Sequence, residues 1–357
     1  MNKKIIGMCS GLLAVTFASM LFVGGNKTDW KTRYDTSLPD LNSGSWKETL
    51  HTDFTKIENM EQLLAANWAP SPHVKRNVEY WCDDMLEFTE NGLIVHSEQR
   101  NNHNCDVCGV SEGIFTGGIE TRRMADEKSE VLFAQAYGYF EATVIVSRGT
   151  GMWSAFWLQS GGTGKIGNQG RDGSEIDVYE SSFMAGTPTK TGQAIHYDAY
   201  NAPWYRSKGN VTDVGYNLYD GLPHTYALKW TPNEYVMYVD GTPVWATDYG
   251  GVSQVPEFLR LTVEIRPNQW GPYAQKLGDF VNHTDGTNDF VIQDVKVYQN
   301  TEYEKFARTD ADFKDKKNLY KGLLIGGSTA AAALGAAAIG FAAKAIYKAR
   351  KRKSGNQ

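Results

Sequence analysis

The chain has 357 residues and a formal net charge of −5, which leaves room for one large domain or two ordinary ones. Residues 1–25 carry two positive charges and residues 322–357 carry six, so residues 26–321 carry a net charge of −13. This acidic middle region argues against nucleic acid and sulfated polysaccharide as partners and suits a neutral glycan.

The first 25 residues have the pattern of a secretory signal. Residues 1–4 are a short basic start and residues 5–25 are uncharged. This pattern predicts a signal peptide or an uncleaved signal anchor over residues 1–25. Residues 26–45 are polar, and we interpret them as a leader to the domain that follows.

Residues 46–300 have a repeated rhythm of short apolar runs between Gly, Asn and Asp turns. The clearest runs are residues 92–96, 139–146, 225–230, 235–239 and 290–298. Asp240-Gly241 reads as a hairpin turn between residues 235–239 and 243–246. Together with 36 Gly and few helical patterns, this rhythm predicts an all-β domain built from two packed antiparallel sheets.

Three cysteines lie beyond the N-terminal segment: Cys82, Cys105 and Cys108. In a secreted protein a disulfide is the first expectation, here between Cys82 and either Cys105 or Cys108. The alternative is a zinc site in which His103 joins these cysteines. The absence of a second CxxC motif makes zinc the weaker of the two interpretations.

The most informative segment is Glu-Ile-Asp-Val-Tyr-Glu at residues 175–180. It places three carboxylates in a stretch that otherwise reads as a buried strand, where charged groups are rare unless chemistry requires them. Strand alternation puts Glu175 and Asp177 on one face but sends Glu180 to the other. A β-bulge around Val178 and Tyr179 would return Glu180 to the face of Glu175. We therefore predict that all three carboxylates line one cleft.

The C-terminal region reads as a stalk, a membrane span and a basic tail. Residues 301–321 are charged. Residues 322–343 contain no charge and are just long enough to cross a bilayer as a transmembrane helix. The cluster of Lys and Arg in residues 344–357 predicts a cytoplasmic tail. A basic surface helix is the alternative.

Several stretches, in the same order along the chain, resemble glycoside hydrolase family 16. The carboxylate segment 175–180 is similar to the family's catalytic signature in its bulged, laminarinase-like form. Stretches on both sides of it also fit: residues 117–122, 137–143, 151–158, 224–230, 238–241 and 295–298. The resemblance covers roughly residues 46–300. It implies a β-jelly-roll sandwich of two antiparallel sheets with a concave substrate cleft.

The resemblance also implies a role for each carboxylate. Glu175 would be the nucleophile, and Glu180 would be the acid/base that protonates the leaving oxygen and then activates water. Asp177 would assist, because its negative charge helps to keep Glu180 protonated. The expected outcome is hydrolysis with retention through a covalent glycosyl-enzyme.

Five further residues are candidates for substrate binding. Trp153 and Trp157 share one strand face, where indoles can stack on the apolar face of a sugar, although Trp157 can equally belong to the core. Trp270 lies where the family often has a cleft aromatic residue. His196 can hydrogen-bond a sugar hydroxyl or be a structural histidine, and Trp204 lies in a loop that could form a cleft wall.

Two positions depart from the family pattern. Gln293, followed by Asp294, stands where the family often has an aspartate used in a calcium site, so a structural calcium is in doubt and no cofactor is required. Residues 261–267 differ from the usual Gly-rich segment, so the substrate subsites are expected to differ.

The sequence thus predicts an endo-β-1,3-glucanase, or an enzyme for mixed β-1,3/1,4-glucan, on the extracellular face of the cell membrane. Its partners are a neutral β-glucan and, through the C-terminal helix, the membrane. A transglycosylase that remodels cell-wall glucan would use the same carboxylates. A non-catalytic glucan-binding surface protein is a third interpretation, which the presence of all three carboxylates disfavours.

Overall fold

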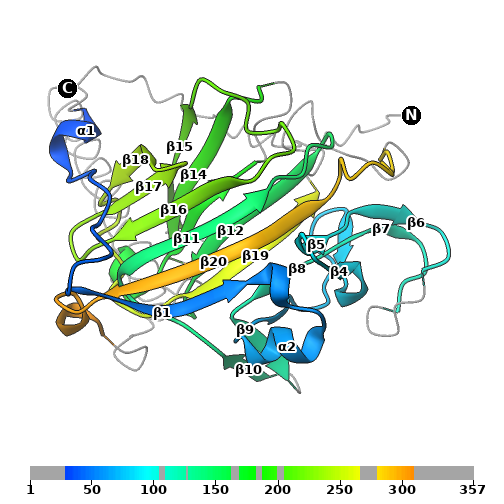
Figure 1. Ribbon diagram of the computed structural model, residues 1–357, viewed down its shortest axis with the longest axis horizontal. Helices are drawn as coiled ribbons and strands as arrows, with labels where there is room; N and C mark the ends of the chain where they lie inside the picture. The colour runs from blue at the N-terminus through cyan, green and yellow to red at the C-terminus, as the bar shows by residue number, and fades with distance from the viewer. Residues whose placement is uncertain are drawn as a thin grey trace, which may run out of the picture.

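The computed structural model describes residues 29–103, 109–125, 128–161, 169–181, 187–198, 205–265 and 280–308. Within these residues two large β-sheets pack face to face (Figure 1). Hydrogen-bonded pairs in both large sheets are antiparallel. The described part of the chain is therefore the all-β, jelly-roll-like sandwich that the sequence predicts.

We call the eight-stranded sheet the outer sheet and the seven-stranded sheet the inner sheet. The outer strands are β1 (Trp46–Asp53), β4 (Leu86–Thr89), β5 (Gly92–Val95), β11 (Gly138–Ile145), β16 (His224–Trp230), β17 (Tyr235–Val239), β18 (Thr242–Thr247) and β20 (Phe290–Asn300). Their order is β18-β17-β16-β11-β20-β5-β4, and β1 also pairs with β20. The inner strands are β2 (Ala69–Pro70), β8 (Gly118–Glu120), β12 (Met152–Gln159), β13 (Glu175–Glu180), β14 (Lys190–Tyr197), β15 (Arg206–Asp213) and β19 (Phe258–Ile265). Their order is β15-β14-β13-β12-β19-β8-β2.

Smaller elements surround the sandwich. A three-stranded sheet contains β3 (Glu79–Trp81), β7 (Gly113–Thr116) and β6 (Glu98–Arg100), and a hairpin contains β9 (Arg122–Ala125) and β10 (Lys128–Val131). The described helices are α1 (Trp30–Arg33), α2 (Met60–Ala65) and the 3-10 turns η1 (Phe54–Lys56), η2 (Asp83–Met85), η3 (Gln169–Asp172) and η5 (Glu304–Phe306). Neither described α-helix is long enough to cross a membrane.

The core lies between the two large sheets and follows strand alternation. In β12, Ser154, Phe156 and Leu158 are fully buried, whereas the residues between them face the opposite side of the sheet. Phe140 and Trp230 from the outer sheet belong to the same core as Phe156, and their rings stack on each other. Burying one face of each sheet leaves the other face of the inner sheet available for a site.

The hairpin between β17 and β18 is the one that the sequence predicts. Asp240 and Gly241 both have positive φ, 47° and 74°. Positive φ at both central residues is typical of a type I′ turn, which matches the right-handed twist of the flanking strands. The turn therefore joins Tyr235–Val239 to a strand that begins at Thr242.

The segments predicted as leader and stalk contact the sandwich where the structure describes them. The ammonium of Lys229, on β16, is buried and donates hydrogen bonds to the carbonyl oxygens of Asp35 (2.6 Å) and Ser37 (2.7 Å). At the other end, Arg308 forms an ion pair with Asp172 on η3. The predicted signal segment, transmembrane helix and basic tail lie outside the described residues, as does most of the stalk.

Candidate active site

A β-bulge in β13 decides where the third carboxylate points. In the pairing with β12, Phe156 lies opposite Tyr179 and the next residue, Trp157, lies opposite Asp177. The pairing with β14 has a register shift between Asp177 and Glu180 as well. The extra residue is therefore in the Val178-Tyr179 region, as the sequence predicts. Both of these side chains enter the core, and Glu180 returns to the face of Glu175 and Asp177.

The three carboxylates line a cleft of about 1040 Å³ on the exposed face of the inner sheet. The cleft crosses the strands, with residues contributed by β15, β14, β13, β12 and β19. Five neighbouring strands at about 4.8 Å spacing correspond to a path of roughly 19 Å. Such a path is long enough for several units of an extended polymer.

The surroundings of Glu180 favour the protonated form of its carboxyl. Burial is the main cause that raises its pKa well above the ordinary value, and the negative charges of Asp177 and Glu175 raise it further. The charge of His196 opposes this rise, as does the indole of Trp153, whose N–H donates to Glu180 Oε1 at 3.0 Å. Trp153, predicted from sequence as a sugar platform, thus also orients the carboxyl of Glu180.

His196 lies between the carboxylates and a tyrosine. It pairs with Glu175 across β13 and β14, and its Nε2 lies 3.0 Å from Asp177 Oδ2 and 4.0 Å from Glu175 Oε1. Burial lowers the pKa of His196, but the hydrogen bond and charge of Asp177, with Glu175 and Glu180, outweigh burial and raise it to about 9. The imidazole is therefore cationic at neutral pH, and its Nδ1 hydrogen-bonds the hydroxyl of Tyr205.

Trp157 lies in the floor of the cleft beneath an arginine. Its side chain is 7% exposed and its N–H donates to Thr262 Oγ1 at 3.0 Å. The guanidinium of Arg260 lies 3.9 Å from the ring centroid of Trp157, and Arg260 Nε is 2.7 Å from Glu120 Oε2. One face of this indole is thus covered by a paired cation. The placement combines the two interpretations from sequence, since Trp157 is largely buried and still lines the cleft.

One end of the cleft is formed by residues that sequence analysis did not identify. Arg76 Nε and Asn77 Nδ2 each donate to the carboxylate of Glu264 at 2.9 Å. These residues lie almost 190 positions apart in the chain, so no local pattern links them. The one available signal was that residues 261–267 depart from the family's usual segment. Trp204 and Trp270, two predicted substrate residues, lie outside the described residues.

Two groups of side chains in the described residues place possible metal ligands within 4.8 Å of one another. One is Glu175, Asp177 and His196 in the cleft, where the cationic imidazole already occupies the space between the carboxylates. The other is Cys82, Asp84 and His103, far from the cleft carboxylates in sequence. On the outer sheet, Asp294 forms ion pairs with His51 and Lys296, so its carboxylate has two protein partners.

Residues 118–270 match the family model of the glycosyl hydrolases family 16. The match includes the inner-sheet strands that carry the three cleft carboxylates. This part of the chain is therefore similar to glycoside hydrolase family 16 domains.

Known relatives agree with this family. The endo-1,3-1,4-beta-glycanase EglC of Rhizobium meliloti is 30% identical over 134 residues, which are 37% of this chain and 26% of EglC. A beta-glucanase of Bacillus subtilis is 30% identical over 112 residues, or 30% of this chain and 39% of that protein. The chain thus spans well under half the length of these relatives.

The fold also resembles solved structures. SCLam, a non-specific endo-beta-1,3(4)-glucanase, superposes with a TM-score of 0.54 at 21% identity, covering 72% of this chain and 92% of SCLam. At this identity the likeness establishes the fold. It places the two large sheets within the same architecture.

The cationic state of His196 can be tested by NMR titration of its imidazole. We expect a pKa of about 9 in the native chain. Asp177→Asn removes the principal hydrogen bond and charge that raise the pKa of His196, so it should fall by about one unit or more. Glu264→Gln, which removes another cleft carboxylate, is the matched control and should leave the titration unchanged. Titration of native His196 near its ordinary value would contradict this account.

Proposed function

We propose that the domain is a retaining, endo-acting glycoside hydrolase that cleaves β-1,3-glucan or mixed β-1,3/1,4-glucan. The observation that carries this proposal is the bulge that aligns Glu175, Asp177 and Glu180 along one cleft. The relatives described as glycanase and beta-glucanase support the substrate class. A cleft that crosses five strands supports attack within a polymer rather than at its end.

In this proposal Glu175 attacks the anomeric carbon while Glu180 donates its proton to the glycosidic oxygen, which releases the leaving sugar. Glu180, now a carboxylate, then takes a proton from water as that water displaces Glu175 from the anomeric carbon. This cycle needs an acid that is protonated at the start. The raised pKa of Glu180, caused first by burial and then by the charge of Asp177, supports that role.

The charges along the cleft support a neutral substrate. Arg76 and Arg260 are the only Arg or Lys side chains among the described cleft-lining residues, and each has a carboxylate partner, Glu264 and Glu120. A sulfate or carboxylate on the sugar would have to compete with these partners. Ring stacking and uncharged hydrogen bonds suit a glucan better.

We also propose that the domain is held at the extracellular face of the cell membrane by the C-terminal segment, with the basic tail in the cytoplasm. The uncharged stretch at 322–343 and the six positive charges that follow support this topology. Protease treatment of intact cells should release the domain and leave the tail protected. Release of the whole protein by high salt alone, or cleavage of the tail from outside, would contradict it.

The activity is tested by release of reducing ends from laminarin and from a mixed-linkage β-glucan by the full chain. We expect a net increase in reducing ends, with the first products in the β-configuration by NMR. Glu175→Gln should abolish turnover because the nucleophile is lost, and Glu180→Gln should lower it by about 10²–10⁴-fold because the acid is lost. Glu141→Gln, on β11 of the outer sheet, is the control and should retain full activity.

The outcomes of this assay separate the three interpretations. Chain-length exchange without a net increase in reducing ends would indicate a transglycosylase. Glucan binding without any bond cleavage would indicate a binding protein. Full activity in Glu175→Gln would rule out the assigned mechanism.

The pH dependence of kcat/KM tests the electrostatic role of Asp177. Activity should fall as pH rises through the pKa of Glu180, because the acid then loses its proton. Asp177→Asn removes a negative charge that raises this pKa, and this contribution is larger than the opposing one from His196. The alkaline limb should therefore move to lower pH, while Glu141→Gln leaves it in place. A limb that stays fixed or moves to higher pH would refute the assignment.

A further inference from the structure

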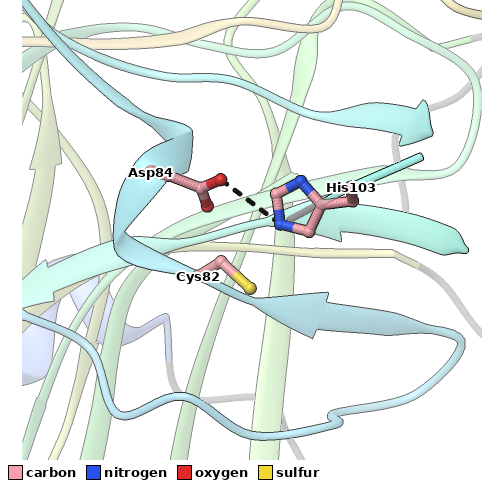
Figure 2. A group of neighbouring side chains, drawn as sticks. All are labelled: Cys82, Asp84 and His103. Atoms are coloured by element: carbon pink, nitrogen blue, oxygen red, sulfur yellow. Dashed lines mark ion pairs between the residues drawn. The ribbon is translucent and has the colours of Figure 1, made fainter. Parts of the chain in front are cut away.

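A group of metal-binding side chain types lies outside the cleft, beside the small sheet β3-β7-β6. Cys82 follows β3, Asp84 lies in η2, and His103 follows β6 (Figure 2). The Cys82 Sγ, one carboxylate oxygen of Asp84 and one ring nitrogen of His103 all lie within 4.8 Å of one another. Figure 2 shows the three side chains directed toward a common space. Sequence analysis linked His103 with Cys82 but did not identify Asp84.

The imidazole of His103 gives the strongest indication that this group binds a ligand. Its side chain is 2% exposed, and its buried Nε2 has no hydrogen-bond partner among the described residues. Asp84 Oδ2 lies 3.3 Å from this nitrogen and forms an ion pair with it when the imidazole is protonated. Leaving a buried ring nitrogen unsatisfied is unfavourable. A cation bound between these side chains would remove that cost.

The backbone around the group is already held in place. Cys82 N–H donates to the carbonyl of Thr116 at 2.9 Å, and His103 N–H donates to the carbonyl of Ser111 at 2.8 Å. Phe115 covers one face of the imidazole, with ring centroids 3.9 Å apart. The Asp84 side chain is 41% exposed, which leaves one side open for an ion and its water to enter.

We propose that Cys82, Asp84 and His103 bind a zinc ion, with water as the fourth ligand. Sulfur, nitrogen and oxygen donors together suit zinc better than calcium or magnesium, which prefer oxygen alone. Zinc bonds of about 2.0–2.3 Å require ligand atoms roughly 3.3–3.8 Å apart, so the side chains must move together by about an ångström. Binding displaces the thiol proton of Cys82.

Zinc binding requires the hydrogen bond between Arg100 and His103 to change. Its Nη1 lies 3.2 Å from His103 Nδ1, and a zinc-bound imidazole carries its remaining proton on Nδ1. Arg100 must therefore release Nδ1 when zinc binds. It has other partners available, because its Nε already donates to Glu98 at 2.8 Å and its Nη1 lies 3.6 Å from Asp84.

The position of the ion gives it a structural role. The apolar cluster of the small sheet has only three buried members among the described residues, Cys82, Met85 and Phe115. So small a core gives little stability, and a metal is a common remedy in small units. The ion would join the end of β6 to η2, which leads directly into β4 of the outer sheet. Figure 1 shows this unit at one end of the sandwich.

The test uses the full chain, purified without chelator and dialysed against metal-free buffer. We expect about one zinc ion per chain by mass spectrometry of metals, and a rise in Tm when zinc is returned to stripped protein. Cys82→Ser and His103→Ala should lose the ion. Asp84→Asn changes a partly exposed side chain and should keep the fold while weakening zinc binding by about tenfold or more.

A matched control variant and the absorption spectrum of the cobalt-substituted protein complete the test. His73 forms a similar pair with Asp83 (3.2 Å) close to the site. It does not belong to the group formed by Cys82, Asp84 and His103, so His73→Ala should keep the ion. Co²⁺ in place of zinc should give a sulfur-to-metal charge-transfer band that Cys82→Ser abolishes. The proposal fails if no zinc binds, if both ligand variants retain it, or if His73→Ala loses it equally. Recovery of Cys82 in a disulfide with Cys105 or Cys108 would also overturn it.

Discussion

One extra residue in β13 determines which side of the inner sheet carries the carboxyl of Glu180. The bulge places Val178 and Tyr179 both in the core, where neither can turn outward without leaving a cavity. The Tyr179 ring packs 4.1 Å from that of Tyr226 on the outer sheet, and its hydroxyl is 2.9 Å from Ser154 Oγ. Contacts between the sheets therefore hold the bulge, and the bulge holds the three carboxylates on one face.

Three carboxylates so close together create a repulsion that the site relieves in two ways. His196 carries a positive charge between Asp177 and Glu175, and Glu180 keeps its proton because burial and its neighbours raise its pKa. The two effects are coupled, since the charge on His196 limits how far the pKa of Glu180 can rise. The surroundings of Glu180 thus favour the protonated form that a general acid requires.

The sequence predicts best what depends on neighbouring residues. The alternation along residues 175–180 and the wrong parity of Glu180 were enough to predict the bulge, and Asp240-Gly241 was enough to predict the hairpin. Contacts between segments that are far apart in the chain have no comparable pattern in the sequence. Tyr205 beside His196, Arg76 beside Glu264 and Asp84 beside His103 come together only through the fold. Periodicity shows which face a side chain occupies but does not identify the partner that a loop brings to it.

The paired arginines show how the same fold can limit its own substrate range. Arg260 is almost fully buried against Glu120, and burial lowers its pKa to about 10 despite the nearby carboxylate. Freeing this guanidinium for an anionic sugar would break its ion pair with the buried Glu120 carboxylate and leave Arg122 as the remaining cationic partner of Glu120. Arg76, which is more exposed, forms an ion pair with Glu264 at the cleft edge. Both arginines therefore act as fixed parts of the cleft wall, with Arg260 over the Trp157 ring, and this arrangement suits an uncharged polymer.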